Sequence, residues 1–212
     1  MITIKSFVFN SFQVNSFVLS DGTGDCIIID PGCNDAREKN ELSSYIDNNR
    51  LKPVALVNTH FHVDHVLGNH FVGERYHLEP TGHKAGKMFW ETAREFGSVF
   101  NLELDEIKRP VHFVEDGDEI TFGQSTLEVR YTPGHADGSI CLVNHPQKFV
   151  IAGDVLFQAS IGRTDLPTGD FDTLMQSIRE KLFTLEDDYT VYPGHGPKTS
   201  IGFERQHNPF IE

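Results

Sequence analysis

The sequence predicts a mixed α/β fold for its 212 residues, and two observations support this prediction. Short apolar segments that end at turn residues occur in both halves of the chain, as is typical of β-strands. Other segments repeat apolar residues at three- and four-residue spacing, which indicates amphipathic helices. Because no linker rich in Pro, Gly or Ser divides the chain, and this length suits one large domain, we expect a single domain over residues 1–212.

The first half of the chain favours antiparallel strands followed by a strand–helix–strand unit. Residues 2–9 and 12–19 are rich in Phe, Val and Ile, which are residues that strands favour. Residues 26–29 and 54–57 are continuous apolar runs, which are typical of buried strands. Between these two runs, residues 35–49 are polar with apolar side chains at helical spacing.

The second half is expected to begin with a helix at 83–97 that has an aromatic face, followed by an irregular surface segment at 98–110. Further strands are expected at 111–114, 119–122, 126–131, 140–143, 149–152 and, as the final strand, 190–192. A last helix is expected at 171–185, because Asp170 can cap it and a stripe of apolar residues predicts a side that faces the core. The stripe consists of Phe171, Leu174, Ile178, Leu182 and Leu185.

Charge and composition argue against several classes of protein. The chain has 18 Lys and Arg against 31 Asp and Glu, and this net charge of −13 disfavours a nucleic-acid partner because phosphate contacts need a basic surface. No apolar run approaches the ~20 residues that span a bilayer, so no membrane association is expected. The N-terminal residues lack the pattern of a secretory signal. Three scattered cysteines, Cys26, Cys33 and Cys141, do not suit a disulfide framework, so the cytoplasm is the expected location.

The strongest functional signal is the segment Thr59-His60-Phe61-His62-Val63-Asp64-His65. It places four side chains that can bind metal within six residues, directly after a buried strand. Because residues i and i+2 of an extended segment point the same way, His60 and His62 can face one metal ion. Asp64 and His65 lie further around the turn and can face another.

Three more segments place a histidine or aspartate beside a glycine at the end of a strand, where glycine permits a tight turn. They are Thr132-Pro133-Gly134-His135, Ala152-Gly153-Asp154 and Tyr192-Pro193-Gly194-His195-Gly196. Together with the first segment they supply seven candidate ligands, five His and two Asp, enough for two metal ions with one carboxylate between them. We therefore expect two divalent metal ions per chain. Ligands without thiolates suit zinc, with iron or manganese as alternatives.

This set of residues, His60-x-His62-x-Asp64-His65 followed by His135, Asp154 and His195, resembles that of the metallo-β-lactamase superfamily. The resemblance implies a four-layer αββα sandwich, in which helices cover two mixed β-sheets and the metals lie at one edge. Within the superfamily, the chain is most similar to the glyoxalase II-like (hydroxyacylglutathione hydrolase-like) branch. The similarity consists of Asp154 in place of a cysteine at the bridging position and of segments 160–167 and 202–210.

The resemblance also implies the role of each residue. His60, His62 and His135 would hold the first metal ion, Asp64, His65 and His195 the second, and Asp154 would bridge the two. The implied reaction is hydrolysis of a small-molecule thioester of the S-lactoylglutathione type. A metal-bridging hydroxide would attack the acyl carbon, while Asp64 and Asp154 offset the charge of the metals. Asp30, after the strand at 26–29, would either fix a ligand histidine from outside or simply open a turn.

The chain departs from two-domain glyoxalase II, whose helical C-terminal domain helps to hold glutathione. About seventeen residues follow His195, which leaves no room for such a domain, so we expect none. Arg163 is then the main candidate for pairing with a substrate carboxylate, and Lys198 is a weaker one. The alternative for Arg163 is a structural salt bridge with Asp165.

Other functions remain open on the sequence alone. An iron enzyme resembling persulfide dioxygenases would use His60, His135 and Asp154, which are all present. A hydrolase of another small acyl substrate would use all seven residues, and a regulatory module would bind metal without catalysis. A nuclease of the same fold is disfavoured by the net charge, and a β-lactamase by Asp154 in place of a cysteine.

Overall fold

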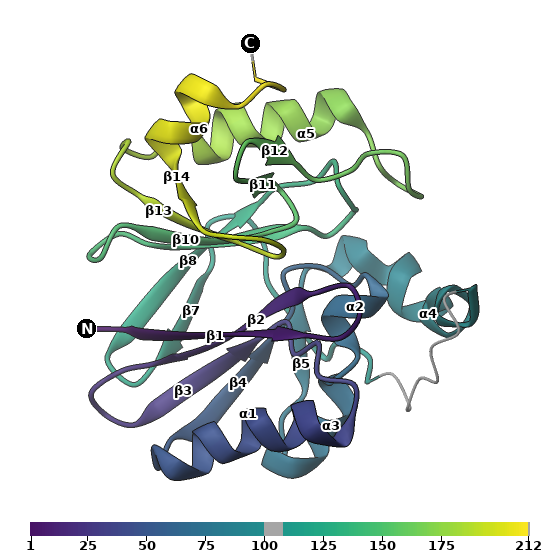
Figure 1. Ribbon diagram of the computed structural model, residues 1–212, viewed down its shortest axis with the longest axis vertical. Helices are drawn as coiled ribbons and strands as arrows, with labels where there is room; N and C mark the ends of the chain where they lie inside the picture. The colour runs from purple at the N-terminus through teal and green to yellow at the C-terminus, as the bar shows by residue number, and fades with distance from the viewer. Residues whose placement is uncertain (100–107, 212) are drawn as a thin grey trace.

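Two six-stranded sheets pack face to face, and helices cover the outer face of each, which gives four layers (Figure 1). The αββα sandwich expected from the sequence is therefore confirmed. The computed structural model describes residues 1–99 and 108–211. None of the helices in these ranges is long and apolar enough to cross a membrane.

The first sheet has the strand order β1-β2-β3-β4-β5-β6. Its strands are β1 (Thr3–Phe9), β2 (Val14–Ser20), β3 (Asp25–Ile29), β4 (Lys52–Val57), β5 (Pro80–Gly82) and β6 (His112–Phe113). The first three strands pair antiparallel, and β3 to β6 pair parallel. Helices α1 (Ala36–Asn48) and α3 (Asn69–Tyr76) lie on its outer face.

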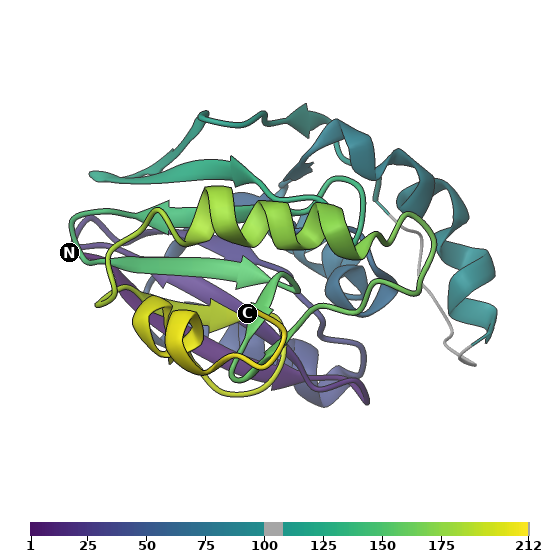
Figure 2. The ribbon, with the colours of Figure 1, turned by 90° about the horizontal axis from the view of Figure 1, so that it is seen from above.

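The second sheet has the order β14-β13-β10-β9-β8-β7. Its strands are β7 (Glu119–Phe122), β8 (Ser125–Tyr131), β9 (Ile140–Asn144), β10 (Phe149–Gly153), β13 (Thr190–Pro193) and β14 (Thr199–Ser200). Only β10 and β13 pair parallel; the other neighbours are antiparallel. Seen from above, α5 (Phe171–Ser177) and α6 (Ile201–His207) lie across this sheet (Figure 2). A small hairpin, β11 (Leu156–Phe157) with β12 (Ser160–Ile161), follows β10.

Successive side chains of a strand point to opposite faces of the sheet, and this alternation determines which layer each residue contacts. In β3, Ile27 and Ile29 point between the two sheets, whereas Cys26 and Ile28 point toward α1. Because both faces of the strand are covered, its residues form a continuous apolar run rather than an alternating pattern. Complete burial of one such isoleucine contributes about 1.5–3 kcal/mol relative to exposure, so these runs fix the register of the central strands.

Helix α1 is connected to the β1–β2 turn through one buried glutamate. Asp35 caps the helix by accepting a hydrogen bond from the backbone N–H of Glu38. The Glu38 carboxylate in turn accepts hydrogen bonds from the backbone N–H groups of Asn10 and Asn34. The helix expected at 35–49 is thus confirmed, and it fixes the turn that lies beside the candidate site.

The helix expected at 171–185 forms, but it is shorter and its stripe is less regular. After α5 the chain continues as a π-helical turn, η2 (Ile178–Leu182). Leu174, Ile178 and Leu182 are fully buried against the sheet. The prediction for Phe171 is wrong: its side chain is 47% exposed, because at the first position of α5 it borders a shallow groove with Phe210 instead of the sheet.

Several elements were not expected. The strand at 190–192 is not the final one, because β14 and α6 follow it; β14 has only two residues and so leaves no apolar run to recognise. Also unexpected were α2 (Val63–Val66), α3 and β5, which are four, eight and three residues long. The helix expected at 83–97 forms as η1 (Lys84–Gly86) and α4 (Lys87–Val99).

The surface segment expected at 98–110 lies mostly outside the described residues. Ser98 and Val99 still belong to α4, which corrects the start of that segment. Residues 108–110 have no regular secondary structure.

The three cysteines provide a test of the packing. Each is fully buried, and burial raises the pKa of each thiol to about 12, so the unreactive protonated form prevails at pH 8. We expect Cys26, Cys33 and Cys141 to resist a thiol reagent in the folded protein at pH 8 and to react promptly in guanidinium chloride. Mass spectrometry of the labelled protein checks this. Labelling of one cysteine within minutes under native conditions would contradict the packing around it.

Candidate metal centre

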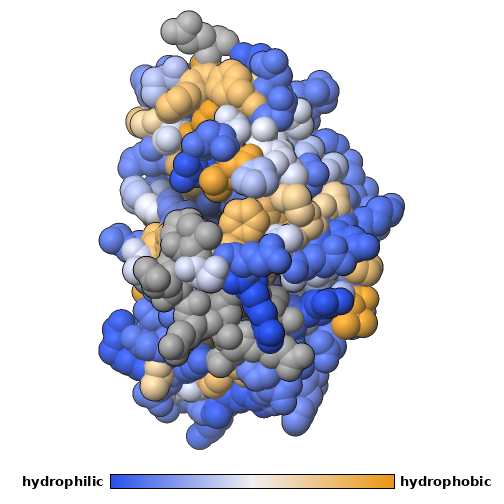
Figure 3. Space-filling model, turned by 90° about the vertical axis from the view of Figure 1, so that its right-hand side faces the viewer, coloured by the Kyte–Doolittle hydropathy of each residue, from blue (hydrophilic) through white to orange (hydrophobic). Residues whose placement is uncertain are grey.

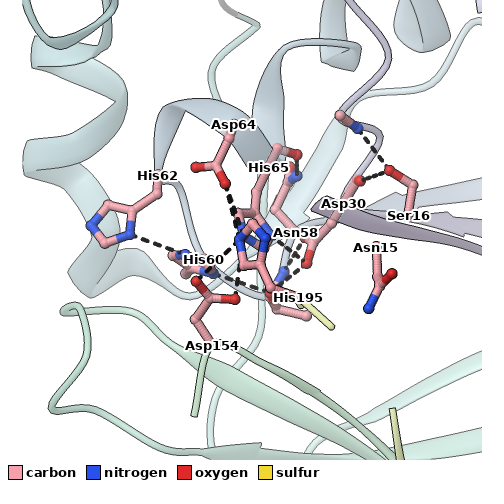
Figure 4. Close-up of polar contacts among 12 residues, drawn as sticks. Asn15, Ser16, Asp30, Asn58, His60, His62, Asp64, His65, Asp154 and His195 are labelled. Atoms are coloured by element: carbon pink, nitrogen blue, oxygen red, sulfur yellow. Dashed lines mark hydrogen bonds and ion pairs between the residues drawn. The ribbon is translucent and has the colours of Figure 1, made fainter. Parts of the chain in front are cut away.

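Four loops converge at one edge of the sandwich, and they carry all seven side chains that the sequence singled out; Figure 4 labels six of them, all except His135. Strands β8, β10 and β13 of the second sheet run in the same direction, because β8 and β10 are both antiparallel to β9 and β13 is parallel to β10. Their carboxyl ends therefore meet at one edge, where His135, Asp154 and His195 follow. The loop after β4 of the first sheet brings the other four to the same place.

Three histidines form the first group. The ring nitrogen Nδ1 of His62 lies 3.1 Å from Nε2 of His60 and 2.9 Å from Nε2 of His135. Burial, together with the neighbouring histidines, holds the pKa of His60 well below its ordinary value and lowers that of His62 to about 3. Burial lowers the pKa of His135 as well. The three rings are therefore neutral at pH 7, the form in which imidazole binds a metal ion.

The second group consists of Asp64, His65 and His195. Oδ2 of Asp64 lies 3.1 Å from Nε2 of His195 and 3.6 Å from Nε2 of His65. Burial alone would lower the pKa of His65, but the carboxylates of Asp64, Asp154 and Asp30 raise it well above its ordinary value. These buried carboxylates thus favour a positive charge at this point. A divalent cation would stabilise them more than a single proton on His65 would.

Asp154 lies between the two groups. Its Oδ1 is 3.4 Å from Nε2 of His65, and its Oδ2 is 3.5 Å from Nε2 of His195 and 3.6 Å from Nε2 of His135. Burial raises its pKa, but the charges of His65, His135 and His195 outweigh burial, so the pKa lies well below its ordinary value. One carboxylate, ionised at neutral pH, therefore faces both groups (Figure 4).

Partners outside the centre orient the histidine rings. Nδ1 of His135 donates a hydrogen bond to the carbonyl of Arg163 (2.8 Å), and Nδ1 of His195 donates to the carbonyl of Phe12 (3.0 Å). Nδ1 of His65 donates to the carboxylate of Asp30 (3.0 Å). Each bond leaves Nε2 facing the centre as the potential ligand atom. Of the two roles considered for Asp30, the geometry supports that of an outer partner.

Asp30 is itself fixed on every side. Its carboxylate accepts hydrogen bonds from the backbone N–H and the hydroxyl of Thr59, at 2.7 and 2.5 Å. Its backbone has a left-handed conformation, with φ +46°, and its carbonyl accepts a hydrogen bond from the hydroxyl of Ser16. The potential ligand atoms of Asp30, His60 and His65 also lie within 4.8 Å of one another. The carboxylate oxygens of Asp30, however, already accept the hydrogen bonds from Thr59 and His65. Ser16 is an ordinary strand residue, so no sequence pattern singled it out.

Two glycines allow the loops to approach this closely. A Cβ atom on Gly153 would lie 2.5 Å from the hydroxyl oxygen of Thr59, and φ at Gly153 is +49°. A Cβ atom on Gly194 would lie 2.1 Å from Oδ1 of Asp154. A larger residue at either position would therefore displace the loops that carry the ligands. This agrees with the tight turns expected where glycine lies beside a ligand in the sequence.

The residues present fit a pair of metal ions. Among the described residues, buried atoms with no hydrogen-bond partner include Nε2 of His65 and Oδ1 of Asp154, which face each other in the centre. Two of the clusters able to hold an ion are the three-histidine group and the group of Asp64, His65 and His195. Neutral imidazoles and carboxylates without thiolates suit zinc and also iron or manganese.

A cavity of about 600 Å³ opens beside the centre. Arg163 lines it, but its side chain is 61% exposed, and its guanidinium donates hydrogen bonds to both carboxylate oxygens of Asp165, at 2.7 Å each. Lys198 is exposed in the loop after His195 and is not among the described residues that line the cavity. The geometry thus brings Arg163 to the cavity while also showing the structural salt bridge.

Comparison with known proteins identifies the family. The sequence profile of the metallo-β-lactamase superfamily matches residues 10–195, which include all seven residues of the centre. The chain belongs to the metallo-β-lactamase superfamily. The superfamily match is supported by two relatives. Hydroxyacylglutathione hydrolase GloC of Haemophilus influenzae is 36% identical over 95% of this chain and 94% of its own, and the probable metallo-hydrolase YqgX of Bacillus subtilis is 37% identical over 94% and 92%.

Solved structures of the superfamily share the whole fold. BLEG-1, a B3 metallo-β-lactamase, is 31% identical with a TM-score of 0.90, and the match covers 99% of both chains. TTHA1623 in a di-iron-bound form is 31% identical with a TM-score of 0.87, over 98% of this chain and all of its own. ETHE1 from Myxococcus xanthus is 28% identical with a TM-score of 0.80, over 98% and 83%. One of these neighbours is named as a β-lactamase and another was solved in a di-iron-bound form, so the fold alone selects neither a substrate nor a metal.

The outer bond from Asp30 to His65 can be tested by Asp30→Asn, which keeps the shape and removes the charge. Loss of an outer partner typically costs 10–100-fold in metal affinity or activity, so we expect about that loss of affinity in competition with a chelator. The matched control is Asp172→Asn, at an exposed position on α5, which should bind metal as the wild type does. Equal affinity in both variants would show that Asp30 merely shapes the turn.

Proposed function

We propose that this chain hydrolyses thioesters of the hydroxyacylglutathione type with two divalent metal ions, zinc being the expected metal. The observation that carries the proposal is the pair of three-residue groups that share Asp154. The relation to GloC supports the substrate class, and metallo-hydrolase relatives support the reaction class. We further propose that residues 1–212 form one domain, because elements from both ends of the chain join the same sandwich.

The proposed ligands are those that the geometry groups. One ion would be held by His60, His62 and His135, the other by Asp64, His65 and His195, with Asp154 shared. When bound, two such ions activate water at neutral pH and polarise the acyl carbonyl. In the overall reaction the oxygen of water bonds to the acyl carbon, the carbon–sulfur bond breaks, and the thiol leaves with a proton.

The residues of the chain orient the reactants. Asp64 and Asp154 are both ionised at neutral pH, and their oxygens can accept hydrogen bonds from the attacking water. The hydrogen bonds from His65, His135 and His195 to their outer partners keep the rings from rotating, so the centre is organised before substrate binds. Apolar side chains around the cavity exclude bulk water from the acyl group.

Metal content is the first test of the proposal. We expect about two equivalents of metal per chain, mainly zinc, in protein purified without added metal, and loss of S-lactoylglutathione hydrolysis after chelation. Elemental analysis and a thiol-release assay measure both. One iron per chain with oxygen consumption on a persulfide would favour the dioxygenase-like alternative. Because TTHA1623 was solved in a di-iron-bound form, iron is worth measuring beside zinc. Turnover of a β-lactam alone would instead favour the activity for which BLEG-1 is named.

The shared carboxylate gives a second test. Asp154→Ala should abolish hydrolysis and reduce the bound metal, because it removes a carboxylate that faces both groups of the centre. The fold should persist, since the strands on either side are held by apolar packing. Circular dichroism, elemental analysis and turnover check the three expectations. Full turnover with two bound metals would show that Asp154 is not shared.

Substrate binding by Arg163 can be tested with variants of Arg163 and of its ion-pair partner Asp165. An exposed ion pair contributes about 0–1 kcal/mol, so a substrate carboxylate could displace Asp165 from Arg163 at little cost. We expect Arg163→Ala to raise KM for S-lactoylglutathione about three- to tenfold with kcat nearly unchanged. Asp165→Asn frees the guanidinium and should lower KM or leave it unchanged. If both variants raise KM equally, the pair is structural and Arg163 does not bind substrate.

A further inference from the structure

Phenylalanines form much of the wall of the cavity beside the metal centre. Phe12, Phe61, Phe89, Phe96 and Phe157 line it, and they come from both halves of the chain. Figure 3 shows apolar side chains bordering a hollow on this face of the molecule. We call these five residues the phenylalanine wall. From the sequence, the aromatic residues of α4 indicate only one face of a helix, and no motif connects them with the site.

The wall reaches the metal centre itself. The ring of Phe89 packs edge-on against the ring of His62, with centroids 4.8 Å apart. On the other side, the carbonyl of Phe12 fixes His195, and the ring of Phe157 lies 6.3 Å from the same histidine. A group bonded to a carbonyl carbon at the centre would therefore meet aromatic surface immediately.

The charges of a glutathione thioester determine which of its two halves can pack against the phenylalanine wall. The peptide half carries two carboxylates and an ammonium group, and their burial against apolar surface would cost several kcal/mol without charged partners. Among the described residues that line the cavity, Arg163 is the one with a permanently positive side chain. It lies in the segment between β12 and α5, whereas Phe89 and Phe96 lie on α4. The peptide half therefore suits the Arg163 side, and the acyl half suits the part of the wall that α4 supplies.

We propose that the phenylalanine wall binds the side group of the acyl half, and that the preferred acyl group is larger and more apolar than lactoyl. This inference rests on the proposed thioester hydrolysis. A lactoyl group presents only a methyl to the wall and leaves the partly exposed rings of Phe12, Phe96 and Phe157 largely uncovered. An aryl or large aliphatic side group would cover that surface and gain the hydrophobic free energy of its burial.

The direct comparison uses two thioesters that differ only in this side group, S-lactoylglutathione and S-mandeloylglutathione. Because the thiol is the same, the ratio of their kcat/KM values reports the acyl side group alone. An additional apolar group in a fitting pocket is worth about 10–200-fold, so we expect S-mandeloylglutathione to be preferred at least about tenfold. A ratio at or below one would overturn the inference and leave thioester hydrolysis standing.

Two variants test whether the wall causes the preference for the mandeloyl group. Phe96→Ala removes part of the wall, and we expect it to lower the mandeloyl-to-lactoyl ratio about three- to tenfold. Ala93→Phe fills the cavity from α4, because Ala93 also lines it, and should lower the ratio further. The matched control is Phe203→Ala, a 41% exposed phenylalanine on α6 outside the cavity lining, which should keep the wild-type ratio. An unchanged ratio in both cavity variants, with native circular dichroism, would contradict the assignment.

Binding of the free acids separates this inference from the proposed function. Calorimetry with the metal-loaded protein should show mandelate binding about tenfold more tightly than lactate, and Phe96→Ala should reduce the difference. If neither thioester is hydrolysed but mandelate still binds more tightly, the proposed function fails and the wall's preference stands. If the acids bind equally, or neither binds, the preference is overturned whatever the activity.

Discussion

The buried carboxylate of Asp30 is the constraint on which the centre depends. It is 1% exposed and accepts hydrogen bonds from Thr59 and His65, while Ser16 holds its carbonyl. Its backbone N–H donates to the carbonyl of Val57. One residue thus joins β2, the end of β3, the end of β4 and α2. A buried charge without such partners would cost several kcal/mol, so the surroundings must keep this geometry, and with it the orientation of His65.

The sandwich explains why two ions would hold the protein together as well as serve its chemistry. The first sheet's loop supplies His60, His62, Asp64 and His65, and the second sheet supplies His135, Asp154 and His195. Each group of the centre contains residues from both sheets. An ion bound to either group would therefore connect the two sheets across their shared edge. Since the unfolded chain does not hold these residues together, the binding free energy of the ions would add to the stability of the sandwich.

The sequence predicts those features that local patterns encode. Continuous apolar runs identified the buried strands, and apolar side chains at helical spacing identified α1. Elements such as β5 and β14 could not be expected, because two or three residues carry no period and form strands only when a neighbour pairs with them. The proposed ligands were recognisable since their residue types fall at strand ends. By contrast, the carbonyls of Phe12 and Arg163 act through the backbone, which every residue possesses, so no side-chain pattern could reveal them.

The same distinction applies to the aromatic residues of α4. In the sequence their spacing indicates only a helix with one apolar face, and the usual partner of such a face is the core. In the structure Phe89 faces His62, and Phe96 lines a cavity beside charged groups. Two divalent ions would carry four positive charges, and the carboxylates of Asp30, Asp64 and Asp154 would offset most but not all of them before the attacking water loses its proton. Apolar walls strengthen the attraction of the remaining charge for the negative charge that develops on an acyl oxygen, because they exclude the water that would screen it. The phenylalanines would therefore contribute to the chemistry as well as to the choice of acyl group.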